Sequence, residues 1–301
     1  MNRLFYVFLC LCLCWPASSL QADILLRQAD GSKLALEQPA QRLLTLSPNL
    51  AELVFAAGAG DRLLATVEYS EYPEAAAALP RIGDAFRLDV ENIVALRPDL
   101  IIAWDSGNPK AAVQQLRDLG IDVWSVEIRE PEQIADTLRE IGHATSTEAT
   151  AKEAADDFQA RLDQLKAHYR AVSTLDYFYQ VDARPLFTIN GDHLISKGLA
   201  LCGGRNVFAA EPALAFQVGH EAVIVANPDA LVAPALPGEP DPLERWLEWP
   251  AMQAVENGDL FTLDANKISQ ATPRWLDSIE QACGLLNGLR NISEVENEQR
   301  D

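Results

Sequence analysis

Basic residues are scarce in this chain of 301 residues, which carries 24 Lys and Arg against 44 Asp and Glu and a formal net charge of −20. A surface this acidic repels phosphate backbones and anionic lipid head groups, which argues against nucleic acid and against a membrane surface as partners. The need for solubility explains most of the acidity. The remainder would steer the protein towards a basic partner.

The chain also lacks the short motifs that mark common catalytic sites. It contains no Gly-x-Ser-x-Gly sequence, no P-loop and, after the first 14 residues, no Cys-x-x-Cys pair. A metal receptor needs two or three histidines and a carboxylate that meet at one point. Only His193 and His220, of four histidines, fall near predicted cleft loops, and His143 and His168 fall on helices. We therefore expect no catalytic residue, no metal site and no enzyme activity.

Long apolar runs are rare, and the one at the N-terminus is short. Asn2-Arg3 precedes an apolar segment that ends at Cys14, and small residues follow. This pattern predicts a secretory signal peptide over residues 1–22, too short to be a membrane anchor. Lipidation at Cys14 is an alternative, although Leu13 stands where a lipidation signal normally has a small residue.

Cysteine is scarce once this leader is removed. The mature chain keeps only Cys202 and Cys283. An even pair in an exported protein favours a disulfide. Two buried free thiols are the alternative.

The most informative feature that the chain does have is a repeated segment. Residues 91–105 read as a short helix, a Pro stop and a buried strand, and residues 221–234 repeat this pattern less clearly. Glu91 precedes Pro98 by the same spacing that separates Glu221 from Pro228. One unit used twice predicts two similar α/β lobes, and two lobes form a cleft in which a ligand can bind.

The chain between the two copies differs from the rest. Strand and helix patterns alternate on either side of it, which predicts mostly parallel sheets covered on both faces. Residues 146–172 contain no Gly or Pro and carry one apolar stripe, so we expect a helix about 40 Å long that joins the lobes. A coiled-coil partner helix is the alternative. The predicted parts are a signal peptide (1–22), an N-terminal lobe (23–145), a spine helix (146–172), a C-terminal lobe (173–291) and a flexible tail (292–301).

Aromatic residues make up only 7% of the chain, but several follow predicted strands. Ligands of open α/β sheets bind beyond the carboxyl ends of the strands, where these residues fall. Flat rings suit a large, rigid, mostly apolar ligand. Packing in the core is the alternative, above all for Trp104. The residues concerned are Tyr69, Tyr72, Phe86, Trp104, Phe187 and Phe216.

Glu91 and Glu221 each open a predicted helix, one in each lobe. An acid at a helix start gains from the macrodipole and the free N–H groups, which is a purely local explanation. The matching positions favour a second role. One carboxylate on each lobe would meet an Arg on each half of a two-fold partner.

Four segments together resemble the helical-backbone periplasmic receptors of ABC importers, which handle cobalamin, haem, siderophores and metals. The resemblance runs from about residue 40 to the closing helix. It is strongest to the cobalamin branch of this family, with two Rossmann-like lobes on a single spine helix. The segments are Leu-Ser-Pro-x-x-x-Glu-Leu (46–53), Tyr-Ser-Glu-Tyr-Pro (69–73), Ile-Val-Ala-Leu-Arg-Pro-Asp-Leu-Ile-Ile-Ala-Trp (93–104) and Cys-Gly-Gly-x-Asn-Val-Phe (202–208).

The resemblance implies a periplasmic protein, monomeric when free, that captures a corrinoid and delivers it to an inner-membrane ABC permease dimer with its ATPase. Cobalamin would be cargo, and no cofactor is implied. By position, Tyr69, Trp104 and Phe187 would contact the corrinoid, Glu91 and Glu221 would dock on the permease, and Cys202 and Cys283 would form the family disulfide.

Some positions depart from the family pattern. Ala85 and Ala215 stand where aromatic residues are expected, with Phe86 and Phe216 beside them. In the loop before Pro273, Asn266 and Gln270 stand where an acid and an Arg are expected. Their amides can hydrogen-bond the propionamide arms of a corrinoid but supply no charge.

Two other functions stay open. A haem or ferric-siderophore receptor of the same family is the first, with Arg81, Arg87 or Arg205 as donors to a siderophore. Haem receptors often place a Tyr where Asp84 stands. The second is a periplasmic chelatase-like enzyme, which would need a metal-binding pair of His193 and His220.

Overall fold

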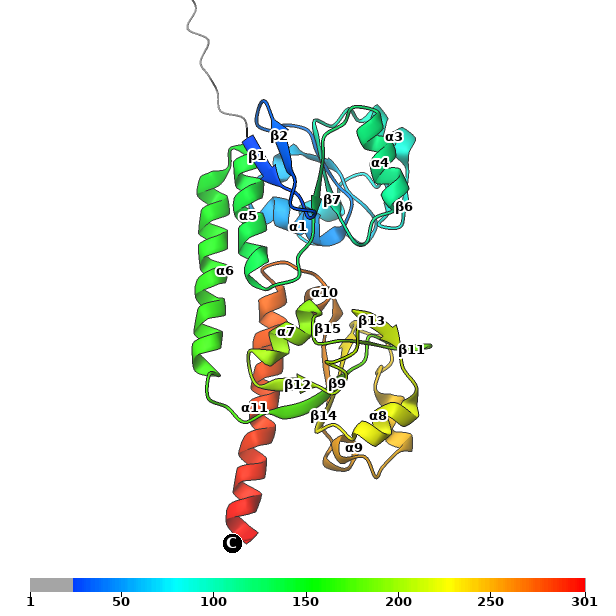
Figure 1. Cartoon of the computed structure of the whole chain (residues 1–301), viewed down its shortest axis with the longest axis vertical. Helices are drawn as coiled ribbons and strands as arrows, with labels where there is room; N and C mark the ends of the chain where they lie inside the picture. Colours follow the sequence, from blue (N-terminus) through cyan, green and yellow to red (C-terminus); the bar gives the residue numbers. More distant parts are fainter. Residues whose placement is uncertain (1–23, 301) are drawn as a thin grey trace, which may run out of the picture.

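The computed structural model describes residues 24–300, with side chains up to residue 291. The predicted signal peptide and the lipidation alternative at Cys14 lie outside the described residues. Figure 1 shows two α/β lobes, one above the other, with α6 running alongside both. The two predicted lobes with parallel sheets are confirmed.

The N-terminal lobe is built on a four-stranded parallel sheet in the order β4-β3-β7-β8. The side chains alternate between its faces, because successive residues of a strand point in opposite directions. Leu43 and Leu100 face α1 and α5, whereas Leu44 and Ile101 face α3 and α4. The elements are β3 (Leu43–Thr45), α1 (Pro48–Ala56), β4 (Leu63–Ala65), α3 (Val90–Ala95), β7 (Leu100–Trp104), α4 (Lys110–Asp118), β8 (Val123–Val126) and α5 (Glu132–Thr145).

Short elements complete this lobe. An antiparallel hairpin turns at Gly31, whose φ of 84° favours glycine. A smaller antiparallel pair follows the aromatic loop. The elements are β1 (Ile24–Arg27), β2 (Lys33–Leu36), η1 (Gly60–Arg62), α2 (Glu74–Ala77), β5 (Gly83–Asp84) and β6 (Arg87–Leu88).

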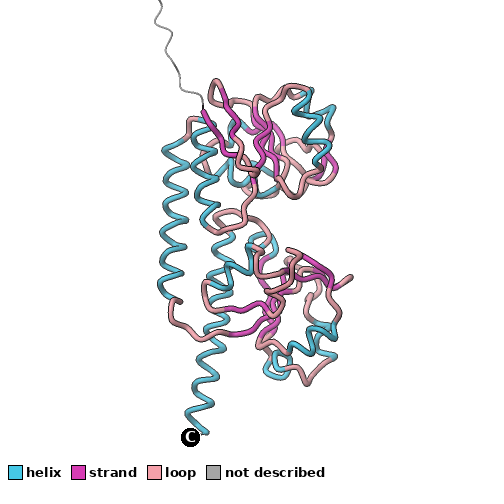
Figure 2. The backbone as a smooth tube through the Cα atoms, viewed as in Figure 1, coloured by secondary structure: helices cyan, strands magenta, loops and turns pink. Residues whose placement is uncertain are grey.

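The C-terminal lobe repeats the plan, with a parallel sheet in the order β12-β9-β14-β15 and a three-stranded antiparallel sheet beside it. Figure 2 shows the strands of the two lobes gathered separately. The strands are β9 (Leu175–Tyr179), β10 (Asp182–Ala183), β11 (Leu186–Ile189), β12 (Gly204–Asn206), β13 (Ala215–Gln217), β14 (Ala230–Ala235) and β15 (Leu260–Asp264). The helices are α7 (Leu194–Ala200), α8 (His220–Ala226), η2 (Glu244–Glu248), α9 (Gln253–Asn257), α10 (Ala265–Ile268) and α11 (Trp275–Arg300).

The repeated segments occupy equivalent places, as α3–β7 and α8–β14. In both copies the Asp after the Pro holds the neighbouring strand. The Asp99 carboxylate accepts the backbone N–H of Arg42, just before β3, at 2.9 Å, and that of Asp229 accepts the N–H of Asp176 in β9 at 2.7 Å. The Pro ends the helix, and the Asp satisfies a backbone donor near the start of an inner strand.

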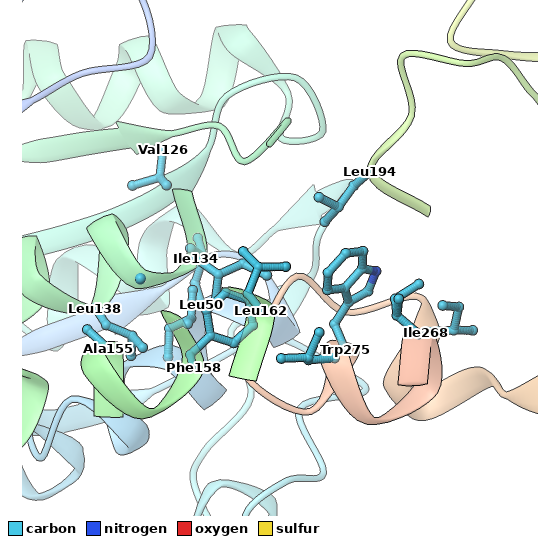
Figure 3. Close-up of a cluster of buried hydrophobic side chains, with 14 of the residues drawn as sticks. Leu50, Val126, Ile134, Leu138, Ala155, Phe158, Leu162, Leu194, Ile268 and Trp275 are labelled. Atoms are coloured by element: carbon cyan, nitrogen blue, oxygen red, sulfur yellow. The ribbon is translucent and has the colours of Figure 1, made fainter. Parts of the chain in front are cut away.

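The spine helix α6 (Glu148–His168) is 21 residues long, about 32 Å at 1.5 Å per residue, and so is shorter than expected. Its apolar stripe is buried, and Arg161 beside that stripe pairs with Asp277 and Glu280 of α11. One apolar cluster therefore continues from lobe to lobe. In Figure 3, Ile134, Phe158 and Leu162 lie on one side of it and Leu194, Ile268 and Trp275 on the other.

The closing helix α11 is longer than the sequence pattern indicates. It continues to Arg300, through residues that the sequence pattern assigned to a flexible tail (292–301). Within residues 24–300, no helix combines the length and the apolar character that crossing a membrane requires.

The predicted disulfide between Cys202 and Cys283 is confirmed, and the alternative of two free thiols is wrong. The bond joins the turn after α7 to α11, with the two Cα atoms 5.4 Å apart and a sequence separation of 81. It closes a long loop and so restricts the unfolded chain.

Replacing both cysteines by serine is expected to lower the free energy of unfolding by about 2–4 kcal/mol. Urea denaturation of the mature protein measures this change. Reductant should shift the midpoint of the wild type in the same direction and leave the double variant unchanged. Equal midpoints for the oxidised wild type and the variant would contradict the expected stabilisation.

Candidate ligand-binding cleft

Two adjoining cavities lie between the lobes. The first, of about 220 Å³, is lined by Trp104 and Arg129 from the N-terminal lobe and by His193 from the C-terminal lobe. The second, of about 200 Å³, is lined by tyrosines of the aromatic loop and by the segment that precedes α11. Pro48 and Gln270 line both. Together they form the predicted cleft at the carboxyl ends of the strands.

Trp104 stands at the end of β7, half-buried, with part of its indole packed on the core. The Asn108 side chain fixes this strand end, because its Oδ1 accepts the backbone N–H of Trp104 at 2.7 Å. Gly107 leaves room for the ring, since a Cβ there would come within 1.9 Å of it. The indole therefore both packs against the core and lines the first cavity, so the two roles that the sequence left open are not exclusive.

The loop after β4 brings two tyrosines to the second cavity. Tyr69 has a φ of 66°, rare for a residue with a side chain, and is 78% exposed. Next to it, the buried Ser70 hydroxyl hydrogen-bonds that of Thr66 at 2.9 Å. This buried bond anchors the loop, so that Tyr69 projects from it.

Asn266 and Gln270 also line the second cavity. Asn266 lies in α10, whose start is capped by the Asp264 carboxylate, which accepts the Asn266 N–H at 2.9 Å. Gln270 follows α10, and both amides lie at the same cavity as the tyrosines. Four of the seven predicted ligand-contact residues thus meet at the two cavities.

The remaining three predicted contacts, all phenylalanines, do not line these cavities. Phe86 is 68% exposed in the turn between β5 and β6. Phe187 and Phe216 lie on the paired strands β11 and β13, but Phe216 is level with Thr188, so the two rings point to opposite faces. Phe216 packs edge-to-face on Phe208, 6.1 Å away. The structure therefore places Phe216 on the core side of this small sheet.

Sequence reasoning missed a buried ion pair at the cleft. Glu52 of α1, only 5% exposed, accepts two hydrogen bonds from Arg274, at 2.9 Å from Nε and 2.6 Å from Nη2. The same guanidinium lies 3.7 Å above the Tyr72 ring. Burial opposes the charged form, but the bond to Glu52 raises the pKa of Arg274 above its usual range. The pair connects the two lobes.

His193 caps α7, with Nδ1 accepting the N–H of Ile195 at 3.2 Å. Burial, together with the positive charge of Arg129, lowers the pKa of His193 to about 4. The ring is therefore neutral at pH 7. Arg129 itself pairs with Glu127 at 2.7 Å.

The histidines do not form a metal site. His220 lies away from the cleft, with its ring centroid 5.1 Å from that of Trp246 and 5.2 Å from that of Trp249. His193 and His220 are therefore not brought together. In the described part of the chain, no group of three His, Cys, Asp or Glu residues is arranged to hold a metal ion.

The two predicted docking acids lie outside the cavities. Glu91 is in the first turn of α3 and Glu221 in the first turn of α8, and both are exposed. Figure 1 places α3 and α8 on the side of the molecule away from α6, one on each lobe. This arrangement provides one carboxylate per lobe on the same side.

Comparison with known proteins gives consistent matches. The model of a family described as "Periplasmic binding protein" matches residues 43–267. The chain is 36% identical over 258 residues to the vitamin B12-binding protein of Vibrio cholerae serotype O1. The aligned stretch covers 85% of this chain and 92% of that protein.

Solved structures agree. The crystal structure of the periplasmic vitamin B12 binding protein BtuF of Vibrio cholerae is similar, with a TM-score of 0.78, 34% identity and coverage of 84% of this chain and 98% of that chain. The periplasmic heme-binding protein RhuT from Roseiflexus sp. RS-1 has a TM-score of 0.72 at 20% identity, over 83% of this chain and 99% of that chain. At this identity the second likeness concerns the fold alone.

Proposed function

Because this chain belongs to the periplasmic binding protein family, we propose that it captures cobalamin or a related corrinoid between its lobes. The relatives that share a third of its residues are named vitamin B12-binding proteins. They are binding proteins and not enzymes, which supports a protein with no turnover of its own.

The observation that carries the proposal is the position of Trp104 at the wall of the interlobe cleft. A corrin is a large, rigid and mostly apolar ring, and an indole offers it a wide contact surface at little entropic cost. Tyr69 stands at the adjoining cavity, and the amides of Asn266 and Gln270 match the propionamide arms. We also assign Phe187 to this ligand, because its ring lies on the opposite face of the small sheet from Phe216, which packs on Phe208. Phe86, in the turn between β5 and β6, lies outside both cavities, as Phe187 does.

In this proposal the protein is exported to the periplasm by a cleaved signal peptide (1–22) and is monomeric. We propose that it consists of two lobes, 23–145 and 173–291, with 146–172 as the spine region and 292–301 as the tail. The loaded receptor delivers its ligand to an inner-membrane ABC permease dimer with its ATPase. Glu91 and Glu221 dock on that permease.

The alternatives receive less support. A haem receptor of the same fold shares only 20% of the residues, and Asp84 stands where haem receptors often have a Tyr. A chelatase-like enzyme would need His193 and His220 at one site, but His220 packs against Trp246 and Trp249, away from the cleft.

The test is isothermal titration of the mature protein with cyanocobalamin, with haemin and a ferric siderophore as comparators. We expect tight one-to-one binding of cyanocobalamin, weakened about 100-fold by Trp104→Ala, because a buried aromatic contact of this kind contributes about 2–4 kcal/mol. Trp249→Ala, far from the cleft, is the matched control. Binding of a comparator in place of cyanocobalamin would move the substrate to another branch of the family.

A further inference from the structure

We propose that Arg129 from the N-terminal lobe and His193 from the C-terminal lobe form a subsite in the first cavity for the phosphodiester of a complete corrinoid. The inference rests on the proposed function. It concerns the nucleotide loop, which cobalamin has and the truncated corrinoid cobinamide lacks. The subsite would therefore make this receptor selective between two ligands that share the same ring.

Arg129 offers free donors at the cavity wall. Its Nε pairs with one Glu127 oxygen at 2.7 Å, and the other Glu127 oxygen accepts the Ser106 N–H at 2.9 Å. Both carboxylate oxygens are thus occupied. The two terminal nitrogens of Arg129 make no hydrogen bond within residues 24–291, and the side chain is 38% exposed. A planar guanidinium edge is the group best suited to an oxyanion with two acceptor oxygens.

The neutral ring of His193 offers one hydrogen-bond donor, and its hydrogen bond to the backbone fixes which nitrogen that is. Since Nδ1 accepts the N–H of Ile195, the single proton of the neutral ring is on Nε2, which makes Nε2 a donor. This assignment is incompatible with metal ligation by Nε2 in the same tautomer. The charged groups near the ring are Arg129 and Glu127, and Lys197, one turn along α7, is paired with Glu130 of the other lobe.

These two donors face one cavity from opposite lobes. Both residues line it, and the Arg129 charge is close enough to disfavour protonation of His193. The remaining lining is largely apolar, with Leu50, Ile195 and Ile268 among it. Hydrogen bonds to a charged group are stronger in such surroundings than in water.

A phosphodiester fits this arrangement better than an amide arm does. Its negative charge is shared between two oxygens, so one oxygen can accept from Arg129 and the other from His193. An amide has a single acceptor oxygen and no charge, so it gains less from a guanidinium. Because one donor comes from each lobe, occupancy of the subsite would also favour the closed arrangement of the lobes.

The test compares cyanocobalamin with dicyanocobinamide by titration, for the wild type, Arg129→Gln, His193→Asn and the double variant. His193→Asn keeps an acceptor that can cap Ile195 but shortens the reach into the cavity. Each variant is expected to bind cyanocobalamin about 10- to 100-fold more weakly and dicyanocobinamide within about 3-fold of the wild type. Arg170→Gln, an exposed arginine away from the cleft, is the matched control. Phosphorus NMR of bound cyanocobalamin should show a resonance that differs between the wild type and Arg129→Gln.

Several outcomes would overturn the subsite. Equal loss for both corrinoids would mean that the two residues support the cleft as a whole. Unchanged binding of cyanocobalamin in the double variant would mean that neither residue contacts the phosphodiester. A wild type that binds neither corrinoid would contradict the proposed function itself. Titration of the wild type therefore separates failure of the proposed function from failure of the subsite.

Discussion

Uptake of cobalamin is expected to stop when Glu91 and Glu221 are both changed to Lys, while the affinity of the purified protein for cobalamin stays within about twofold of the wild type. Each carboxylate would meet an Arg on one half of the permease dimer. Reversing both charges turns two attractions into two repulsions, and like-charge contacts at an interface cost several kcal/mol.

The geometry separates docking from ligand binding. Both acids are exposed at the starts of short helices, and neither lines a cavity. The Asp89 side chain caps α3 by accepting the Asn92 N–H at 3.0 Å, so the carboxylate of Glu91 stands on a fixed helix start. A single reversal leaves one lobe able to dock, so it should reduce uptake less than the double reversal does.

The control for this experiment has the same change of net charge. Glu153 on α6 and Glu256 on α9 are exposed, and changing both to Lys alters the charge equally. Uptake by cells that carry the variants and titration of the purified proteins are the two measurements. Loss of affinity in parallel with uptake, or loss of uptake in the control, would remove the docking roles.

Local patterns were sufficient to predict much of this fold. In each Pro-Asp element the Pro ends a helix, and the Asp carboxylate accepts a backbone N–H at the neighbouring strand. Each copy of the pattern therefore marks the same structural unit. Trp104 was predicted at the cleft because it ends an apolar strand, and strand ends meet at one edge of a parallel sheet. The disulfide followed from having two cysteines in an exported chain.

Contacts between distant segments were not predictable in this way. Glu52 and Arg274 are 222 residues apart, and no local pattern connects them. The one available signal was an acid among the buried positions of α1. Phe216 illustrates a second limit, since β11 and β13 are separated by α7 and β12. Whether Phe187 or Phe216 faces the cleft depends on the register in which β11 and β13 pair, and the sequence does not specify that register.

The length of α6 shows how packing decides where a periodic pattern stops. The apolar stripe continues as far as Tyr169 and Val172, but the helix ends at His168. The chain turns there into β9, and Arg290 of α11 holds that turn by donating to the Ser173 carbonyl at 2.7 Å. Tertiary contacts thus shorten a helix that its own sequence would allow to continue.

The second large effect is expected at the interlobe ion pair. Arg274→Met should lower the free energy of unfolding by about 3–5 kcal/mol, because it leaves the Glu52 carboxylate buried without a partner. Changing both residues, as Glu52→Leu with Arg274→Met, should cost much less, since it removes the isolated charge as well. Urea denaturation of the two single variants and the double variant gives the coupling between them.

The exposed pair of Lys152 and Asp156 on α6 is the matched control for that cycle. Its members are one helical turn apart and face solvent, so Lys152→Met should cost no more than about 0.5 kcal/mol. The difference between the two pairs comes from burial, because both join an acid to a base by a direct contact. If Arg274→Met cost no more than Lys152→Met, the carboxylate of Glu52 would have another source of stabilisation, and the pair would not be what holds the lobes together at the cleft.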